Sequence, residues 1–405
     1  MPEQIHTHDS GQASHLRLIL TLGILSCVGP FAIDMYLPAL PQVARELQTS
    51  AAAAQYSISA LFLSFGLAQM IYGPVADQYG RKWPLYIGLT IFVAASIGCY
   101  LAGSIAELIV MRFVQGLGAA VVMVIPRAII RDLLTGPAAT RLMANLMLVI
   151  SVSPMLAPLG GSLISELAGW REIFAFLALA GIVSLVLTAT QLPETLSDEN
   201  RVVLNVGSMA RGIAMLSRDP QFMLLTLIGA FGFATFFIFL ASAPFVYTGQ
   251  YGLSPSQFAM AFAVNAAGFF TASQFAGYLG ERFGMLRMVV CSAIGFGLVT
   301  ALLLFLVLAG IHPLWLIIAM LIAANAFLGF IIPTAMVLAL DDHGDIAGLA
   351  SSYGGTLQMV TGVICAAIGG WFFDGTVLPM VAAIAAAAMV AVVLALFLKP
   401  VAVTA

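Results

Sequence analysis

Charged residues are scarce in this chain. Only 8% of its 405 residues are charged and 61% are hydrophobic, whereas a soluble domain carries about 25% charged residues. The sequence has no run of basic residues, so a nucleic-acid partner is not expected. This composition leaves too little polar surface to face water. It excludes an ordinary soluble protein and predicts a chain that lies in the lipid bilayer.

Reactive clusters and nucleotide-binding sequences are also missing. The four cysteines lie in apolar runs, as small apolar fillers do, so neither a disulfide nor a metal site is expected. The lack of a GxxxxGK[ST] loop argues against ATP as the energy source in this chain. An intramembrane enzyme would need paired acids or a cluster of His, Ser and Cys at membrane depth. We therefore expect no enzymatic activity, no metal and no cofactor.

Apolar runs of roughly 20 residues, the length that crosses a ~30 Å hydrocarbon core, recur along the whole chain. Such segments must be helices, because open sheet edges cannot lie in lipid. The polar first fifteen residues lack the features of a cleavable signal peptide, so the first run is expected to be retained. We predict about twelve helical spans, near residues 16–40, 52–75, 83–102, 106–129, 141–165, 171–192, 221–247, 256–279, 287–309, 313–339, 347–372 and 376–398.

The distribution of Lys and Arg predicts the topology. With the N-terminus in the cytoplasm, only Arg45 and Arg171 fall outside, and the other Lys and Arg of the loops and tails fall inside, as the positive-inside rule requires. We therefore expect a multi-pass protein of the bacterial inner membrane with both termini cytoplasmic. The predicted parts are a cytoplasmic tail (1–15), an N-terminal six-helix bundle (16–192), a cytoplasmic central linker (193–220), a C-terminal six-helix bundle (221–398) and a cytoplasmic tail (399–405).

The two halves repeat each other. Segments 73–80 and 277–284 share glycine, acid, aromatic and glycine at matching positions, with a constant offset of 204 residues. Each segment follows the second span of its half. Parallel repeats of this kind build transporters whose substrate site lies between the halves.

Asp34 is the only acid in the interior of a predicted span, away from the span ends, and its repeat equivalent is Ile238. A carboxylate in the bilayer is costly and normally faces a cavity or a partner, and burial favours its neutral form. Asp34 is therefore predicted to carry the coupling proton and to attract a cationic substrate. The alternative is an acid solvated by headgroups, although the outer end of its helix lies about seven residues, or ~10 Å, away.

Arg112 lies at a similar depth, about six residues or ~9 Å inside the outer end of the fourth span. A nearby arginine stabilises the charged form of an acid. A movement that separates Arg112 from Asp34 would then increase the affinity of Asp34 for a proton. The alternative is a structural role, in which Arg112 binds backbone carbonyls or Gln115.

Three stretches resemble motifs of the major facilitator superfamily. GPVADQYGRK at 73–82 resembles its cytoplasmic loop signature, RFVQGLG at 112–118 the fourth-span motif of proton-coupled members, and PMLAPLGG at 154–161 the fifth-span motif of antiporters. In the last motif, Ala157 stands where the family usually has glycine. The resemblance implies an all-α polytopic fold of twelve transmembrane helices in two pseudo-symmetric six-helix halves. It also implies that the helices of Asp34 and Arg112 face a central cavity.

A finer resemblance is to the bicyclomycin and chloramphenicol resistance subfamily, Bcr/CflA. AIDMYLPALP at 32–41, RAIIRD at 127–132 and AGLASSYG at 347–354 carry it. It implies a drug:proton antiporter. The residues that the resemblances assign to a conformational latch are Gly73, Asp77, Gly80, Arg81, Arg131 and Asp132, and those of the antiporter motif are Pro154, Pro158, Gly160 and Gly161. Alternatively, Arg81 is a positive-inside anchor and Arg131 with Asp132 is a solvated pair.

Aromatic side chains with a few polar groups suit amphiphilic ligands. The candidate pocket residues, any one of which could instead serve packing, are Asp34, Tyr36, Asn145, Phe236, Phe237, Phe239, Asn265, Asn325 and Gln358.

The function expected from these features is proton-driven export of small amphiphilic drugs by a monomer. Two alternatives stay open within the same fold: export of a metabolite such as a sugar, nucleoside or amino-acid derivative, and uptake by proton symport. A channel would need no coupling acid. The sequence does not identify the drug.

Overall fold

The computed structural model describes residues 7–133, 136–201, 206–343 and 346–398, and every element in these ranges is a helix. The N-terminal half comprises α1 (Thr7–Asp34), η1 (Leu37–Ala39), α2 (Leu40–Glu46), α3 (Ala51–Tyr79), α4 (Lys82–Leu101), α5 (Ile105–Ala119), α6 (Val121–Leu133), α7 (Gly136–Leu167) and α8 (Arg171–Gln191). The linker carries η2 (Asp198–Asn200) and α9 (Val206–Arg218). The C-terminal half comprises α10 (Pro220–Phe245), η3 (Val246–Gln250), α11 (Pro255–Phe283), α12 (Met285–Leu308), α13 (Leu314–Asp341), α14 (Ala347–Trp371) and α15 (Val377–Leu396).

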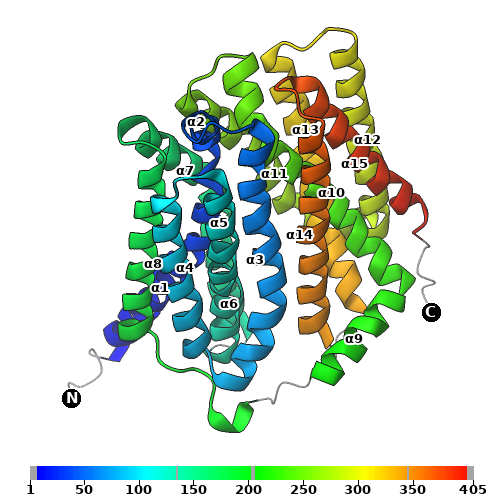
Figure 1. The fold of residues 1–405 in the computed structure, drawn as a ribbon. Coiled ribbons are helices and arrows are strands. Elements are labelled where there is room, and N and C mark those ends of the chain that lie inside the picture. Colours follow the sequence, from blue (N-terminus) through cyan, green and yellow to red (C-terminus); the bar gives the residue numbers. More distant parts are fainter. Residues whose placement is uncertain (1–6, 134–135, 202–205, 344–345, 399–405) are drawn as a thin grey trace.

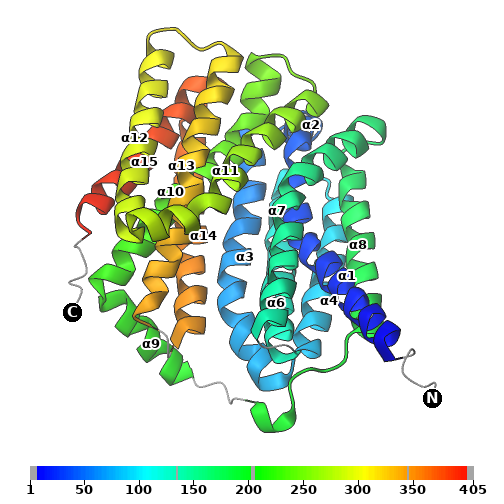
Figure 2. The same cartoon turned by 180° about the vertical axis from the view of Figure 1, so that it is seen from behind.

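The predicted spans are confirmed as helices. In the described part of the chain, ten of them are long and apolar enough to cross a membrane, and α7 and α14 occupy the two remaining predicted positions. The first span is divided into α1, η1 and α2, and the fourth into α5 and α6. The helix α1 begins at Thr7, within the predicted N-terminal tail, and the predicted C-terminal tail lies outside the described residues. Figures 1 and 2 show the two halves as neighbouring helix bundles, with η2 and α9 at one end.

The internal repeat is visible in the backbone. Gly80 ends α3 with φ 89° and Gly284 ends α11 with φ 86°, a region that favours glycine because a side chain would clash there. These glycines lie at the offset of 204 residues that the sequence predicts. Corresponding helices of the two halves therefore end in the same way.

The two halves contact each other along α3 and α14 and along α7 and α11. Near the start of α3, Gln55 lies against Gly370 of α14. The contacts continue along α3 as far as Gln69, which lies against Gly355 about two thirds of the way along α3. Between them, Thr356 Oγ1 donates to Gly66 O at 2.9 Å.

At the ends of α7 and α11 that lie opposite the linker, Glu166 Oε1 accepts from Ser256 N at 3.1 Å and from Ser256 Oγ at 2.7 Å. Figures 1 and 2 show the bundles separating toward the end that carries η2 and α9. The halves are therefore closed against each other on the side opposite the linker.

Candidate functional site

Asp34 is the last residue of α1, where the first span breaks into a turn before η1. Its side chain is buried, with 4% of its surface exposed. Among the residues that the structure describes, none donates a hydrogen bond to this carboxyl group or forms an ion pair with it. A buried carboxyl group without a partner favours its neutral form. The break in α1 therefore presents a group that can gain or lose a proton when its surroundings change.

The antiporter-like motif on α7 packs directly against this break. A Cβ atom on Gly161 would overlap the backbone carbonyl group of Met35, the residue after Asp34. A Cβ atom on Gly160 would lie 3.6 Å from Met35 Cε, which is an ordinary contact. Pro154 and Pro158 lie inside the same helix. Of the two glycines, only Gly161 is required for the close approach of α7 to the end of α1.

Arg112 also holds the end of α1. Its side chain is fully buried, and Nη1 donates to Ala32 O at 2.8 Å and to Gln115 Oε1 at 2.7 Å. The last carbonyl groups of a helix lack intrahelical partners and carry partial negative charge, so a guanidinium group there both satisfies an acceptor and opposes the helix dipole. Gln115 Nε2 continues the chain of hydrogen bonds to Ser96 Oγ on α4 at 2.8 Å.

The charge of Arg112 lies over aromatic rings and not beside an acid. Its Cζ is 4.6 Å from the ring centroid of Tyr36 and 5.6 Å from that of Phe174, a cation–π arrangement. Tyr36 OH also forms a hydrogen bond with Ser57 Oγ at 3.0 Å. Within the described ranges, no hydrogen bond or ion pair joins Arg112 to Asp34. The contacts are those of the structural alternative, in which Arg112 binds a backbone carbonyl and Gln115.

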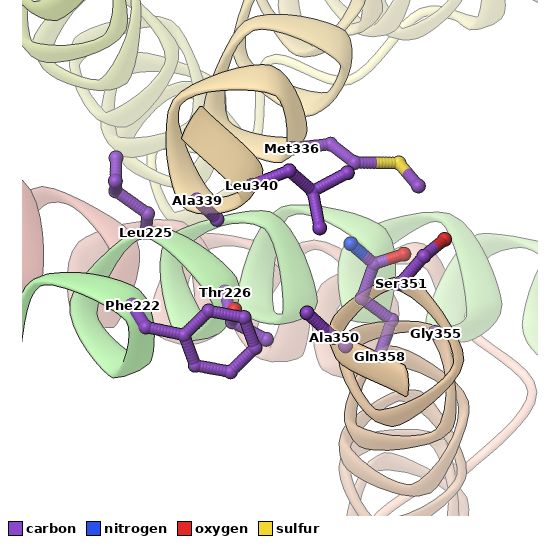
Figure 3. Close-up of a pocket in the computed structure, with 11 residues that line it drawn as sticks. Phe222, Leu225, Thr226, Met336, Ala339, Leu340, Ala350, Ser351, Gly355 and Gln358 are labelled. Atoms are coloured by element: carbon purple, nitrogen blue, oxygen red, sulfur yellow. The ribbon is translucent and has the colours of Figure 1, made fainter. Parts of the chain in front are cut away.

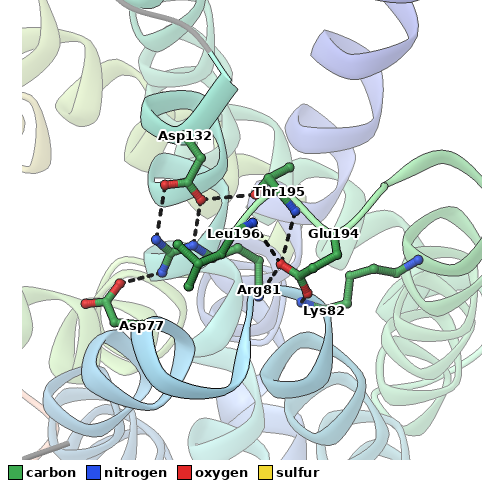
Figure 4. Close-up of polar contacts among 7 residues, drawn as sticks. All are labelled: Asp77, Arg81, Lys82, Asp132, Glu194, Thr195 and Leu196. Atoms are coloured by element: carbon green, nitrogen blue, oxygen red, sulfur yellow. Dashed lines mark hydrogen bonds and ion pairs between the residues drawn. The ribbon is translucent and has the colours of Figure 1, made fainter. Parts of the chain in front are cut away.

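A second polar cluster lies at the linker-side ends of α3, α4 and α6 (Figure 4). Arg81 Nη1 donates to Asp77 Oδ1 at 2.6 Å, and its Nε and Nη2 donate to the two carboxylate oxygens of Asp132 at 2.7 Å and 3.1 Å. Arg81 itself is buried. The bidentate pair is the strong form of an Arg–carboxylate contact. Of the predicted latch residues, Arg131 is exposed and lies outside this cluster. A Cβ atom on Gly73 would lie 4.0 Å from Val124 Cγ1, so this glycine is not required for close packing.

Glu194, just after α8, completes the cluster and was not predicted from the sequence. Its carboxylate accepts from the backbone N of Arg81 at 2.8 Å and of Lys82 at 3.1 Å. Burial alone would raise the pKa of Glu194, but hydrogen bonds from four backbone N–H groups, among them these two, hold that pKa below its usual value. At pH values above about 4.3, the usual pKa of a glutamate, this lowered pKa stabilises the folded protein. The stabilisation is lost as the pH falls through the lowered pKa of Glu194. No spacing could reveal Glu194, because it is 113 residues from Arg81 in the sequence.

All partners in this cluster belong to the N-terminal half or to the start of the linker. The sequence resemblance implied that these residues form a conformational latch. In this conformation the cluster joins α3, α4 and α6 to the segment that follows α8. It forms no contact with the C-terminal half among the described residues.

Asp132→Asn should destabilise the protein by about 3 kcal/mol, because it removes the bidentate charged partner of the buried Arg81 guanidinium and leaves only the half-exposed Asp77. Asp77→Asn should have a smaller effect, because Asp77 is 45% exposed and makes a single contact. Both variants should transport more slowly without losing substrate binding. Thermal unfolding in detergent, with drug binding and transport measured in parallel, checks this order. Arg131→Gln is the matched control and should change stability by less than ~0.5 kcal/mol; equal effects at the two neighbouring positions would contradict the assignment.

Several of the candidate pocket residues pack against other side chains. Phe237 packs across the halves against Phe62, with ring centroids 4.0 Å apart, and Phe236 packs against Phe233 and Phe262. Phe239 stacks on Phe262. Asn325 Nδ2 donates to Asn265 Oδ1 at 2.6 Å. The side chain of Asn145 lies outside those that the structure describes.

Gln358 lines a cavity between α10, α13 and α14 (Figure 3). The cavity also exposes Thr226 and Ser351 and has a volume of about 40 Å³. A drug-sized ligand needs ~300 Å³ or more. This cavity is therefore too small to hold a drug-sized ligand.

Sequence comparison places the chain among bacterial transporters. The sequence model of the Major Facilitator Superfamily matches residues 22–254 and 225–404. An uncharacterized MFS-type transporter, YdgK of Bacillus subtilis, is 33% identical over 92% of this chain and 93% of the relative. A bicyclomycin resistance protein homolog of Haemophilus influenzae is 28% identical over 96% and 97%. Multidrug resistance protein D of Escherichia coli is 28% identical over 87% and 88%.

Structural comparison agrees on the fold. A crystal structure of a D-xylose–proton symporter superposes with a TM-score of 0.74 over 95% of this chain and 98% of that chain, at 16% sequence identity. At that identity the similarity shows the fold alone. The two bundles, the repeated loop, the motif contacts around Met35 and Arg81, and both comparisons show that the chain belongs to the Major Facilitator Superfamily, in its bicyclomycin and chloramphenicol resistance subfamily.

Proposed function

We propose that this protein exports small amphiphilic drugs or antibiotics across the bacterial inner membrane in exchange for protons. The protein acts as a monomer with both termini in the cytoplasm, and the proton gradient supplies the energy without a cofactor. The names of the resistance-associated relatives support drug export. The internal repeat supports alternating access, as do the contacts between the halves, which in the described part of the chain lie on the side opposite the linker.

One observation carries the proton coupling: Asp34 is a buried carboxyl group without a partner in the described structure, and it lies at the break in α1. This break is held by Arg112 through Ala32 O and is packed against Gly161. A movement of α1 relative to α7 would therefore change the solvation of Asp34 directly. Arg112 acts here as a positioning residue, because it reaches the backbone beside Asp34 and not its carboxylate.

A susceptibility panel in a bacterial host that lacks its own efflux pumps tests this function. Expression of the protein should raise the inhibitory concentration of one or more amphiphilic antibiotics, and a protonophore should abolish this protection. Protection that persists with the protonophore would contradict proton coupling. Sensitisation, in which the drug enters faster, would favour uptake by symport. If no antibiotic responds while a sugar or nucleoside is exported, the metabolite alternative holds.

A further inference from the structure

The linker helix α9 is fixed to the C-terminal half by one of its faces. Leu216 is fully buried, and Gly212 packs closely against Leu349 of α14. Ser217 Oγ and Tyr353 OH, also on α14, lie 2.7 Å apart in a hydrogen bond. The position of α9 is therefore tied to the inner end of α14, the helix that contacts α3 across the halves.

The other face of α9 carries an exposed basic stripe, which we define as Arg211, Ala214, Met215 and Arg218. These residues follow the i, i+3, i+4, i+7 spacing that places side chains on one face of a helix. All four are exposed, and Met215 shows 53% of its surface. Together with Asp219 and Pro220 they line an open hollow of about 640 Å³.

The net charge at this hollow is positive. Neither arginine of the basic stripe forms an ion pair within the described part of the chain. Asp219 is already engaged, because its Oδ1 accepts from the backbone N of Gln221 and Phe222 at 2.8 Å and 3.1 Å, and its Oδ2 lies 3.2 Å from His343 Nε2. The stripe thus offers two guanidinium groups and an apolar side chain to a partner.

The basic stripe lies at the boundary of the membrane. Arg218 ends α9, and the apolar span Pro220–Gln250 begins two residues later. Figure 1 shows α9 running obliquely beneath the C-terminal bundle, at the linker end of the molecule. A basic helix at this depth meets the phosphate groups of the lipid leaflet, and guanidinium groups bind phosphate in a bidentate manner.

We propose that the basic stripe binds the headgroup of an anionic phospholipid, with Met215 against the upper part of its acyl chains. The bound lipid anchors α9 and, through Leu349 and Tyr353, the inner end of α14. Because α14 must move against α3 during alternating access, the anionic lipid content of the membrane then sets the rate of transport. The binding itself does not depend on the drug or on proton coupling, so it can be tested separately from the proposed function.

Native mass spectrometry of the detergent-solubilised full-length protein tests the binding, with phosphatidylglycerol and phosphatidylcholine as probes. The wild type should retain phosphatidylglycerol preferentially. Arg211→Gln/Arg218→Gln should bind it roughly 30-fold more weakly, from the loss of two basic contacts near an anionic surface, and the Arg→Lys double variant should retain part of the affinity. Arg282→Gln/Arg287→Gln removes two exposed charges at the junction of α11 and α12, on the same side, and should leave binding unchanged.

Two outcomes would overturn the proposal. If Arg282→Gln/Arg287→Gln loses as much lipid as the α9 variant, binding follows net charge and the stripe is not a site. If millimolar inorganic phosphate displaces the lipid from the wild type, the stripe is a free-anion site. In proteoliposomes, adding phosphatidylglycerol to phosphatidylcholine should speed transport by the wild type but not by Arg211→Gln/Arg218→Gln. An equal response of both proteins would contradict the link to α14.

Discussion

Asp34→Asn should abolish proton-driven drug export while leaving drug binding largely intact. Asparagine keeps the shape of the protonated acid but cannot release a proton, so the coupling between proton and drug is lost. One proton driven across 100 mV supplies ~2.3 kcal/mol, enough for a drug gradient of ~50-fold. In proteoliposomes under an imposed proton gradient, the wild type should approach such a gradient, and the variant should reach about 1.

Asp34→Glu is the control for this variant, because it keeps a titratable group at the break in α1. It should retain part of the gradient-driven transport. Drug binding to detergent-solubilised Asp34→Asn separates a coupling defect from misfolding. Full proton-driven export by Asp34→Asn would show that the proton travels elsewhere, and the acids at the ends of the helices, Glu107, Asp132 and Glu166, would then be the candidates.

Gly161→Ala should destabilise the protein and stop transport, although alanine is the better helix former. The added methyl group would overlap the carbonyl of Met35, so α7 must move away from the break that holds Asp34. Overpacking of this kind costs ~1–3 kcal/mol. Thermal unfolding and drug export, measured on the same preparation, check both effects.

Gly160→Ala is the matched control, one residue away on the same helix. Its methyl group meets only Met35 Cε at 3.6 Å, and the change from Gly to Ala inside a helix gains up to ~1 kcal/mol. We expect unchanged or slightly higher stability and normal transport. Similar losses in the two variants would show that the motif serves general helix packing and has no specific contact with the break.

The fold was predictable because its signals are local. Hydrophobic runs of the length of the membrane gave the helical spans, and the repeat at 73–80 and 277–284 gave the two halves, whose glycines share a positive φ. The break after Asp34 was missed, because a short turn between apolar residues leaves no change in composition. The helix α9 was also missed, because its apolar residues are mixed with two glycines, two serines and two arginines, as in a loop.

The site was predictable only in part, because its contacts join distant segments. The sequence identified Asp34 and Arg112 and proposed either an ion pair or a backbone tie; the structure shows the tie to Ala32. The bond between Arg81 and Asp132 spans 51 residues and that with Glu194 spans 113, so no spacing rule could reveal them. The aromatic residues were grouped as a pocket by type alone, and Phe237 instead packs against Phe62 between the halves.

In a coupled antiporter a drug gradient can drive proton movement just as a proton gradient drives drug export. The claim that this protein exchanges drug for protons is therefore tested most directly by letting a drug gradient drive the exchange. Proteoliposomes containing the wild-type protein are loaded with a drug identified by the susceptibility panel and diluted into drug-free buffer without a pH gradient. A pH-sensitive dye inside the vesicles then reports proton movement. The account predicts that outward drug flux drives protons inward, and that Asp34→Asn releases drug without moving protons. Drug flux with no proton movement in the wild type, or with protons moving in the same direction as the drug, would contradict it.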